Sequence, residues 1–93
     1  MAFNYVLSDR LKDTLRILSK RNRQLSLEAD KKIRQILLCD DITINHYKNL
    51  RHDLSEYKRA HVGKSFVLIF KVFYNEKIIV FDRLEHHDDA YRR

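Results

Sequence analysis

The feature that most constrains the fold is the apolar segment SFVLIFKVFY, residues 65–74. Almost every residue in it is β-branched, aromatic or aliphatic, which is typical of a β-strand. Because a strand of this kind is apolar on both faces, it predicts a central strand whose two faces are each at least partly covered. The rest of the chain must supply neighbouring strands and a covering layer.

Two further segments are expected to pair with this strand: EYKRAHV precedes it and EKIIVFDRL follows it. Gly63-Lys64 suits a tight turn between the first two strands, since glycine readily adopts a positive φ. Asn75-Glu76 separates the next two strands. Turns this short predict a three-stranded antiparallel meander, in which the first and third strands run in the same direction.

The N-terminal half predicts a short strand and two helices. AFNYVL alternates and contains aromatic and β-branched residues, which indicates a strand. Ser8 is expected to cap a helix over SDRLKDTLRILSKR, and a second helix is expected over about 26–38, with only RNRQ between them. So short a connection favours an antiparallel helical hairpin. From 41 to 53 no regular structure is assigned.

The predicted fold class is therefore α+β: an N-terminal strand, a helical hairpin, and a three-stranded antiparallel meander. The hairpin is expected to cover one face of the sheet. The other face is left for a partner or for a partly apolar functional surface.

Length and composition limit the class of protein. Ninety-three residues predict a single domain, 1–93. A single cysteine, Cys39, rules out an internal disulfide and favours a reducing compartment, so a cytoplasmic location is expected. No apolar run is long enough to span a membrane, and no membrane partner is expected. The formal net charge of +6 indicates attraction to a polyanion such as nucleic acid or an acidic protein.

The C-terminal stretch RLEHHDDAYRR gathers residues that could form a metal site, a catalytic cluster or only a solvated tail. Adjacent side chains in an extended segment point opposite ways, and no second cluster with ligand spacing exists. We therefore expect neither a metal nor another cofactor.

Metal-independent cleavage of RNA fits these residues better. It needs a base that takes the 2′-hydroxyl proton, an acid that protonates the departing 5′-oxygen, and cations that stabilise the phosphorane. Because the first and third strands of the meander end at one edge of the sheet, His61, Arg83 and the tail are expected to meet there. Histidine suits both proton roles, Arg83 can bind phosphate, and Tyr91 can stack on a base or assist proton transfer.

Several of these residues also have a purely structural interpretation. His46 and His52 fit ordinary loop positions, and Lys64 fits a turn. Arg83 is the hardest to explain in this way, because an arginine in an apolar strand needs an anionic partner.

Two strings together resemble a known family. YKRAHVGKSFVLIFKV followed by IIVFDRLEHHDDAY resembles the YafQ-like branch of the RelE/ParE toxin superfamily, from prokaryotic toxin–antitoxin pairs. That branch has a histidine-bearing strand, an apolar strand, and a last strand ending in arginine, followed at intervals of four residues by histidine and an aromatic residue. Here these are His61, Arg83, His87 and Tyr91, and the detailed match covers about 57–91.

The resemblance implies a toxin that acts as a ribosome-dependent mRNA endonuclease, cleaving in the decoding site. Its partners would be the ribosome with its mRNA and rRNA, and a cognate antitoxin of the RelB or DinJ type. His87 would be the general acid, Arg83 would stabilise the transition-state phosphate, and His61 would act as the base or orient the 2′-hydroxyl. Tyr91 replaces the more usual phenylalanine. The substrate-binding positions would be Lys58, Arg59, Lys64, Ser65 and His52.

The chain also departs from that branch. Members usually have an acidic residue followed by tryptophan after the turn, whereas this chain has Ser65 and Phe66. An acidic catalytic role at this place is therefore not expected. Two alternatives remain: a ParE-like toxin that inhibits DNA gyrase without catalysis, and a binding module without activity. ParE-like chains generally lack the tail histidines, so the nuclease is favoured.

Overall fold

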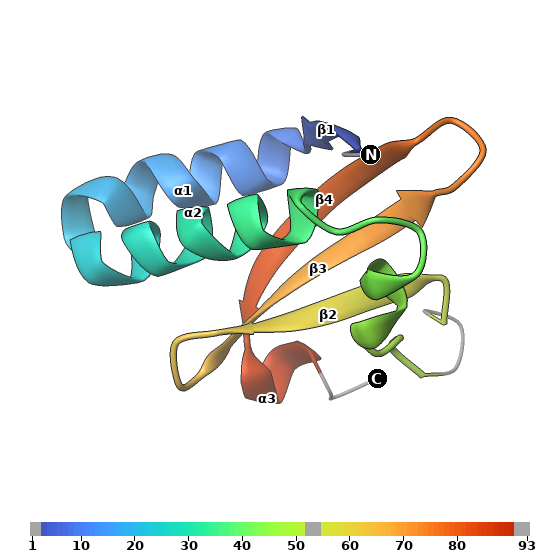
Figure 1. Ribbon diagram of the computed structural model, residues 1–93. Coiled ribbons are helices and arrows are strands. Elements are labelled where there is room, and N and C mark those ends of the chain that lie inside the picture. The colour runs from blue at the N-terminus through green and yellow to red at the C-terminus, as the bar shows by residue number, and fades with distance from the viewer. Residues whose placement is uncertain (1–2, 52–54, 91–93) are drawn as a thin grey trace.

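The computed structural model describes residues 3–51 and 55–90 (Figure 1). It confirms the α+β class, with a strand, two helices and a meander in the predicted order. The elements are β1 (Asn4–Leu7), α1 (Asp9–Arg21), α2 (Arg23–Leu37), the 3₁₀ helix η1 (Thr43–His46), β2 (Tyr57–Val62), β3 (Phe66–Phe73), β4 (Ile78–His86) and α3 (His87–Ala90).

The strands form one mixed sheet in the order β1-β4-β3-β2. β2, β3 and β4 are antiparallel neighbours, as the meander prediction requires, and Gly63 has a φ of 62° in the turn after β2. β1 pairs in parallel with β4, a pairing that the sequence analysis did not assign. Two parallel strands must be joined by a long connection, and the connection from β1 to β4 includes the helical hairpin.

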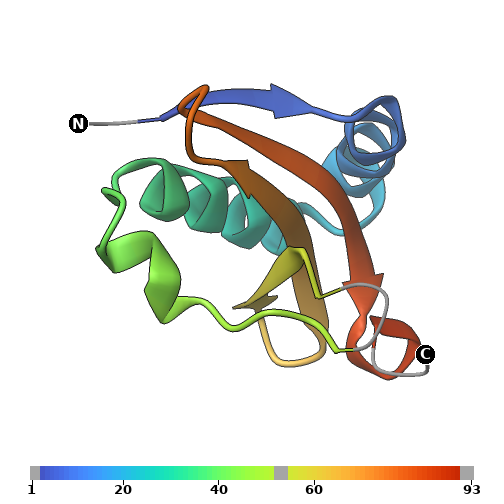
Figure 2. The ribbon, with the colours of Figure 1, turned by 90° about the vertical axis from the view of Figure 1, so that its right-hand side faces the viewer.

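The two helices lie side by side over one face of the sheet (Figures 1 and 2). Ser8 caps α1 as predicted, because its Oγ accepts a hydrogen bond of 3.0 Å from the backbone N of Leu11. The predicted RNRQ connection is wrong: α2 begins at Arg23, and only Asn22 separates the helices. Asn22 donates its backbone N–H to Leu18 O, and its side chain caps α2 at Leu25 N.

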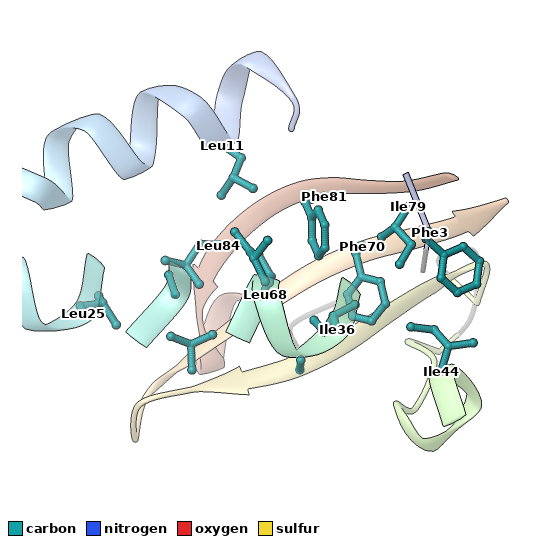
Figure 3. Packing of buried hydrophobic residues seen from close by; sticks show 14 residues of the cluster. Phe3, Leu11, Leu25, Ile36, Ile44, Leu68, Phe70, Ile79, Phe81 and Leu84 are labelled. Atoms are coloured by element: carbon teal, nitrogen blue, oxygen red, sulfur yellow. The ribbon is translucent and has the colours of Figure 1, made fainter. Parts of the chain in front are cut away.

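The main core fills the space between the hairpin and the sheet (Figure 3). Leu11, Leu25 and Ile36 approach from the helices. Phe70 and Phe81 face them from neighbouring strands, with ring centroids 5.8 Å apart. Phe70 and Phe81 face the helices because side chains along a strand alternate between the two faces of the sheet.

The second face of the sheet is covered in part by the chain itself. Val67 and Ile69 of β3 pack there with Leu50 and Ala90. Leu50 is held by a hydrogen bond from its backbone N to Tyr57 O, 2.8 Å long. The expectation that this whole face is left for a partner is therefore wrong near α3. This part of the face is covered because α3 and the segment before β2 place the apolar side chains of Ala90 and Leu50 over the buried strand β3.

A β-bulge in β4 decides which way its last residues face. Phe81 pairs with Phe70 and Arg83 pairs with Ile69, so Asp82 is one extra residue between the two pairs. A bulge of this kind shifts the alternation of side chains. Phe81 therefore faces the hairpin, whereas Arg83 lies on the second face with Ile69.

Within the described residues, no helix has the length and apolar character needed to cross a membrane.

Candidate functional site

Two histidines meet at the edge of the sheet where β2 and β4 end. His61 is in register with Val67 of β3, which pairs in turn with Glu85 of β4. His87 follows the end of β4 as the first residue of α3. The ring centroids of His61 and His87 lie 6.4 Å apart with planes inclined by 23°. The predicted meeting of His61 with the tail therefore takes place.

Backbone contacts set the position of His87. Its N–H donates to Ser65 O across 2.6 Å, which fixes the start of α3 beside the turn between β2 and β3. Ala90 packs on the second face and holds the other end of this helix. His87 Nδ1 lies 3.4 Å from Asp88 Oδ1, and the side chain is 48% exposed. His61 is exposed as well, so two imidazoles are open to solvent at one edge.

Arg83 is placed differently from these histidines. Its side chain is only 7% exposed and lies between two carboxylates. Nη1 is 2.5 Å from Asp82 Oδ2, and Nε is 2.9 Å from Glu85 Oε1. Burial by itself lowers the pKa of Arg83, but the two carboxylates outweigh it and raise the pKa above its usual value. The guanidinium is therefore charged and held in a fixed place under the surface.

A basic hollow of about 350 Å³ adjoins His61. Its walls come from α2, from η1 with the two residues after it, and from the edge strand β2, and none of the described residues that line it is acidic. The hollow has the positive charge that a phosphate group requires. It is lined by Lys32, His46, Tyr47, Lys48, Arg59, Ala60 and His61.

Three basic or imidazole side chains of this hollow were not predicted from the sequence as site residues. Lys32 is a half-buried residue of α2, His46 was interpreted as a loop residue, and Lys48 lies in a segment without predicted structure. The pairing of the segment around Asn49 with β2 brings His46 and Lys48 to His61, and the packing of α2 against β2 brings Lys32 there. Arg59 was predicted to bind substrate, and it does line the hollow, where its Nη1 donates to Asn49 O.

Lys58 does not lie where a substrate-binding residue should. It is 6% exposed, and its Nζ donates to Tyr47 O at 3.1 Å and to Asn49 Oδ1 at 3.0 Å. Burial lowers the pKa of this ammonium group. Since alternate residues of a strand face opposite sides, Lys58 points inward when Arg59 points to the hollow. Lys58 thus fastens the segment before β2 to the sheet, and its predicted substrate contact does not fit this placement.

Lys64 and Ser65 line a second, shallow hollow of about 200 Å³, together with Glu28 of α2 and its N-cap residue Asn22. Ser65 touches the candidate site through its backbone O, which accepts from His87. The predicted residues His52 and Tyr91 fall outside the described part of the chain.

The HHDD stretch forms local contacts. His86 packs edge-on against Phe66 with centroids 5.5 Å apart, and its Nδ1 accepts from Asp88 N. Within the described residues, no three histidine, cysteine, aspartate or glutamate side chains come together in a way that could hold a metal ion.

Comparison with known proteins identifies the family. No protein-family model matches the chain. It is 46% identical over 79 residues to a protein named "Putative toxin RelE4" from Methanocaldococcus jannaschii, which covers 82% of this chain and 84% of the relative.

Solved structures share the fold. The YafQ structure from E. coli superposes with a TM-score of 0.62 at 18% identity, covering 96% of this chain and 98% of YafQ. The toxin–antitoxin complex RelBE2 from Mycobacterium tuberculosis contains a chain that superposes with a TM-score of 0.64 at 16% identity, covering 92% and 99%. These structures show a shared fold, and the 46% identity to the archaeal relative shows that the chain belongs to the RelE family of toxins of toxin–antitoxin systems.

Proposed function

We propose that this toxin is a ribosome-dependent mRNA endonuclease that cleaves RNA by acid–base catalysis without a metal. The observation that carries the proposal is the pair of exposed imidazoles, His61 and His87, at 6.4 Å beside a basic hollow. One phosphodiester group can lie within reach of both rings. Imidazole is the side chain best suited to give and take protons near neutral pH.

The reaction follows from this arrangement. His61 takes the proton of the 2′-hydroxyl, and the 2′-oxygen attacks phosphorus. His87 gives a proton to the 5′-oxygen as the bond between phosphorus and that oxygen breaks. The products are a 2′,3′-cyclic phosphate and a 5′-hydroxyl end. The negative charge that grows on the phosphate is stabilised by nearby cations, with Arg83 as the principal one and Arg59 at the hollow.

The basic surface gives the toxin its affinity for RNA. Lys32 and Lys48 lie at the hollow together with Arg59, and phosphate contacts of this kind position a protein on RNA without reading its sequence. Tyr91, which follows α3 in the sequence, is proposed to stack on a base. Lys64 and Ser65 are proposed to contact RNA beyond the histidine pair.

The proposed partners are the ribosome with its mRNA and a cognate antitoxin, and the proposed location is the cytoplasm. Structures of the same fold include toxin–antitoxin complexes, RelBE2 and DinJ–YafQ, which supports a protein antitoxin as the partner.

The test is expression of the chain with and without a neighbouring antitoxin gene, followed by primer extension on one message that is translated and on a copy without a start codon. We expect cuts only in the translated message and only without the antitoxin. Intact messages together with gyrase-linked DNA breaks would contradict the proposal and favour a ParE-like toxin.

A further inference from the structure

A carboxylate with little exposed surface lies beside Arg83 and is not used by the proposed reaction. Glu85 follows Arg83 by two residues in β4, on the same face of the sheet. Its side chain is 12% exposed, and Oε1 lies 2.9 Å from Nε of Arg83. Burial of a carboxylate is unfavourable unless a cation is close, so Glu85 depends on this arginine.

The same carboxylate connects Arg83 to the helical hairpin. Its other oxygen, Oε2, lies 3.7 Å from Nη2 of Arg10 in α1. Asp82 holds Arg83 from the opposite end of the guanidinium, at Nη1. Arg83 is thus fixed between two carboxylates, one of which is itself anchored to another element of the fold.

Orientation matters for a side chain that is this buried. Only 7% of the Arg83 side chain reaches the surface, so its rotation decides which N–H groups face a bound phosphate. A donor that is held in place before the reaction needs no reorganisation as charge develops on the phosphate.

We propose that Glu85 is a positioning residue that orients the Arg83 guanidinium toward the RNA phosphate and acts only through Arg83. This inference rests on the proposed function, in which Arg83 stabilises the transition state. Arg83 and Glu85 carry opposite charges, and Arg83 Nε and Glu85 Oε1 are in ion-pair contact. The attraction is therefore one of charge, and Glu85→Gln removes it with little change of shape.

A double-mutant cycle on ribosomes programmed with mRNA tests this inference. Glu85→Gln is expected to lower kcat by up to about 100-fold through misplacement of the arginine, with KM nearly unchanged. In an Arg83→Lys background the same substitution is expected to have little further effect. Glu56→Gln is the matched control, because Glu56 forms an exposed ion pair with Lys71 far from the histidines along β3 and should leave kcat unchanged. Equal losses from Glu85→Gln in both backgrounds, or no loss in either, would overturn the inference.

A second measurement does not depend on RNA cleavage. The Nε–Hε resonance of Arg83 in the free toxin is expected to exchange slowly with water in the wild type and to shift and exchange faster in Glu85→Gln. An unchanged resonance would overturn the positioning role. If the wild type fails to cut translated mRNA while this resonance responds to Glu85→Gln, the nuclease proposal fails and the structural link between the two residues stands. Urea unfolding of each variant confirms that it is folded.

Discussion

His61 lies in β2 and His87 directly follows β4, two strands that do not pair with each other, yet the rings lie 6.4 Å apart and nearly parallel. β3 separates β2 from β4, and His87 reaches the pair because the chain leaves β4 and turns into α3 across the end of the sheet. The site therefore depends on the position of a four-residue helix that is held by Ser65 O and by the packing of Ala90.

Loss of either imidazole is expected to abolish most of the activity. His61→Gln and His87→Gln each remove one proton-transfer group, which corresponds to a fall in cleavage rate of about 10² to 10⁴. The measurement is single-turnover cleavage of mRNA on isolated ribosomes. His86→Gln is the matched control, since His86 is adjacent in sequence but packs on Phe66. Activity close to that of the wild type in both His61 and His87 variants would refute the assignment of the pair.

Charge at the basic hollow is expected to control RNA affinity more than the chemical step. Lys32→Gln should weaken binding of RNA and lower the slope of log Kd against log salt by about 1, because one phosphate contact is lost. Lys31→Gln removes the same charge from the neighbouring position on α2, outside the hollow. Titration of both variants with a labelled oligoribonucleotide at several salt concentrations makes the comparison. Identical slopes for the two variants would mean that the hollow does not bind phosphate.

Packing of the Phe81 ring between the sheet and the hairpin is expected to contribute strongly to the free energy of unfolding. Phe81 is fully buried, so Phe81→Ala should lower the free energy of unfolding by about 3 to 5 kcal/mol. Phe73→Ala should have a much smaller effect, because Phe73 is 37% exposed at the end of β3. Urea unfolding followed by circular dichroism measures both. A similar loss in the two variants would contradict the difference in burial between Phe81 and Phe73.

The carboxylate of Asp40 is expected to make the stability of the protein vary with pH in the acid range. The backbone and hydroxyl of Thr43 and the backbone of Ile42 donate to its carboxylate and lower its pKa. A lowered folded-state pKa gives stability that is present above the unfolded pKa of about 3.9 and is lost as pH falls through the folded value. Asp40→Asn should therefore be less stable than the wild type near neutral pH, with the gap closing in acid.

Thermal unfolding at a series of pH values between about 6 and about 2 follows this difference. A gap that stays constant over the whole range would show that the charge of Asp40 does not contribute. Asp41→Asn is a useful comparison, because Asp41 pairs with Lys77 and does not cap η1.

Much of the fold follows from the sequence because the signals are local. The apolar run that became β3 needs strands on both sides, and Gly63 permits the tight turn before it. Ser8 marks the start of α1 since its hydroxyl caps the helix wherever the helix lies. Even the meeting of His61 with the tail follows from strand direction alone. The boundary at Asn22 was missed because that residue both ends one helix and starts the next.

The surroundings of the candidate site depend on contacts that sequence periodicity does not contain. The bulge at Asp82 turned Arg83 to the second face and into contact with Glu85. Pairing of the segment around Asn49 with β2 buried Lys58 and brought Lys48 beside His61. The sequence by itself determined the four strands, the two long helices, their order and the meeting of His61 with the tail. Only the tertiary structure decided which charges are buried and which are presented, because burial depends on long-range neighbours that no local pattern specifies.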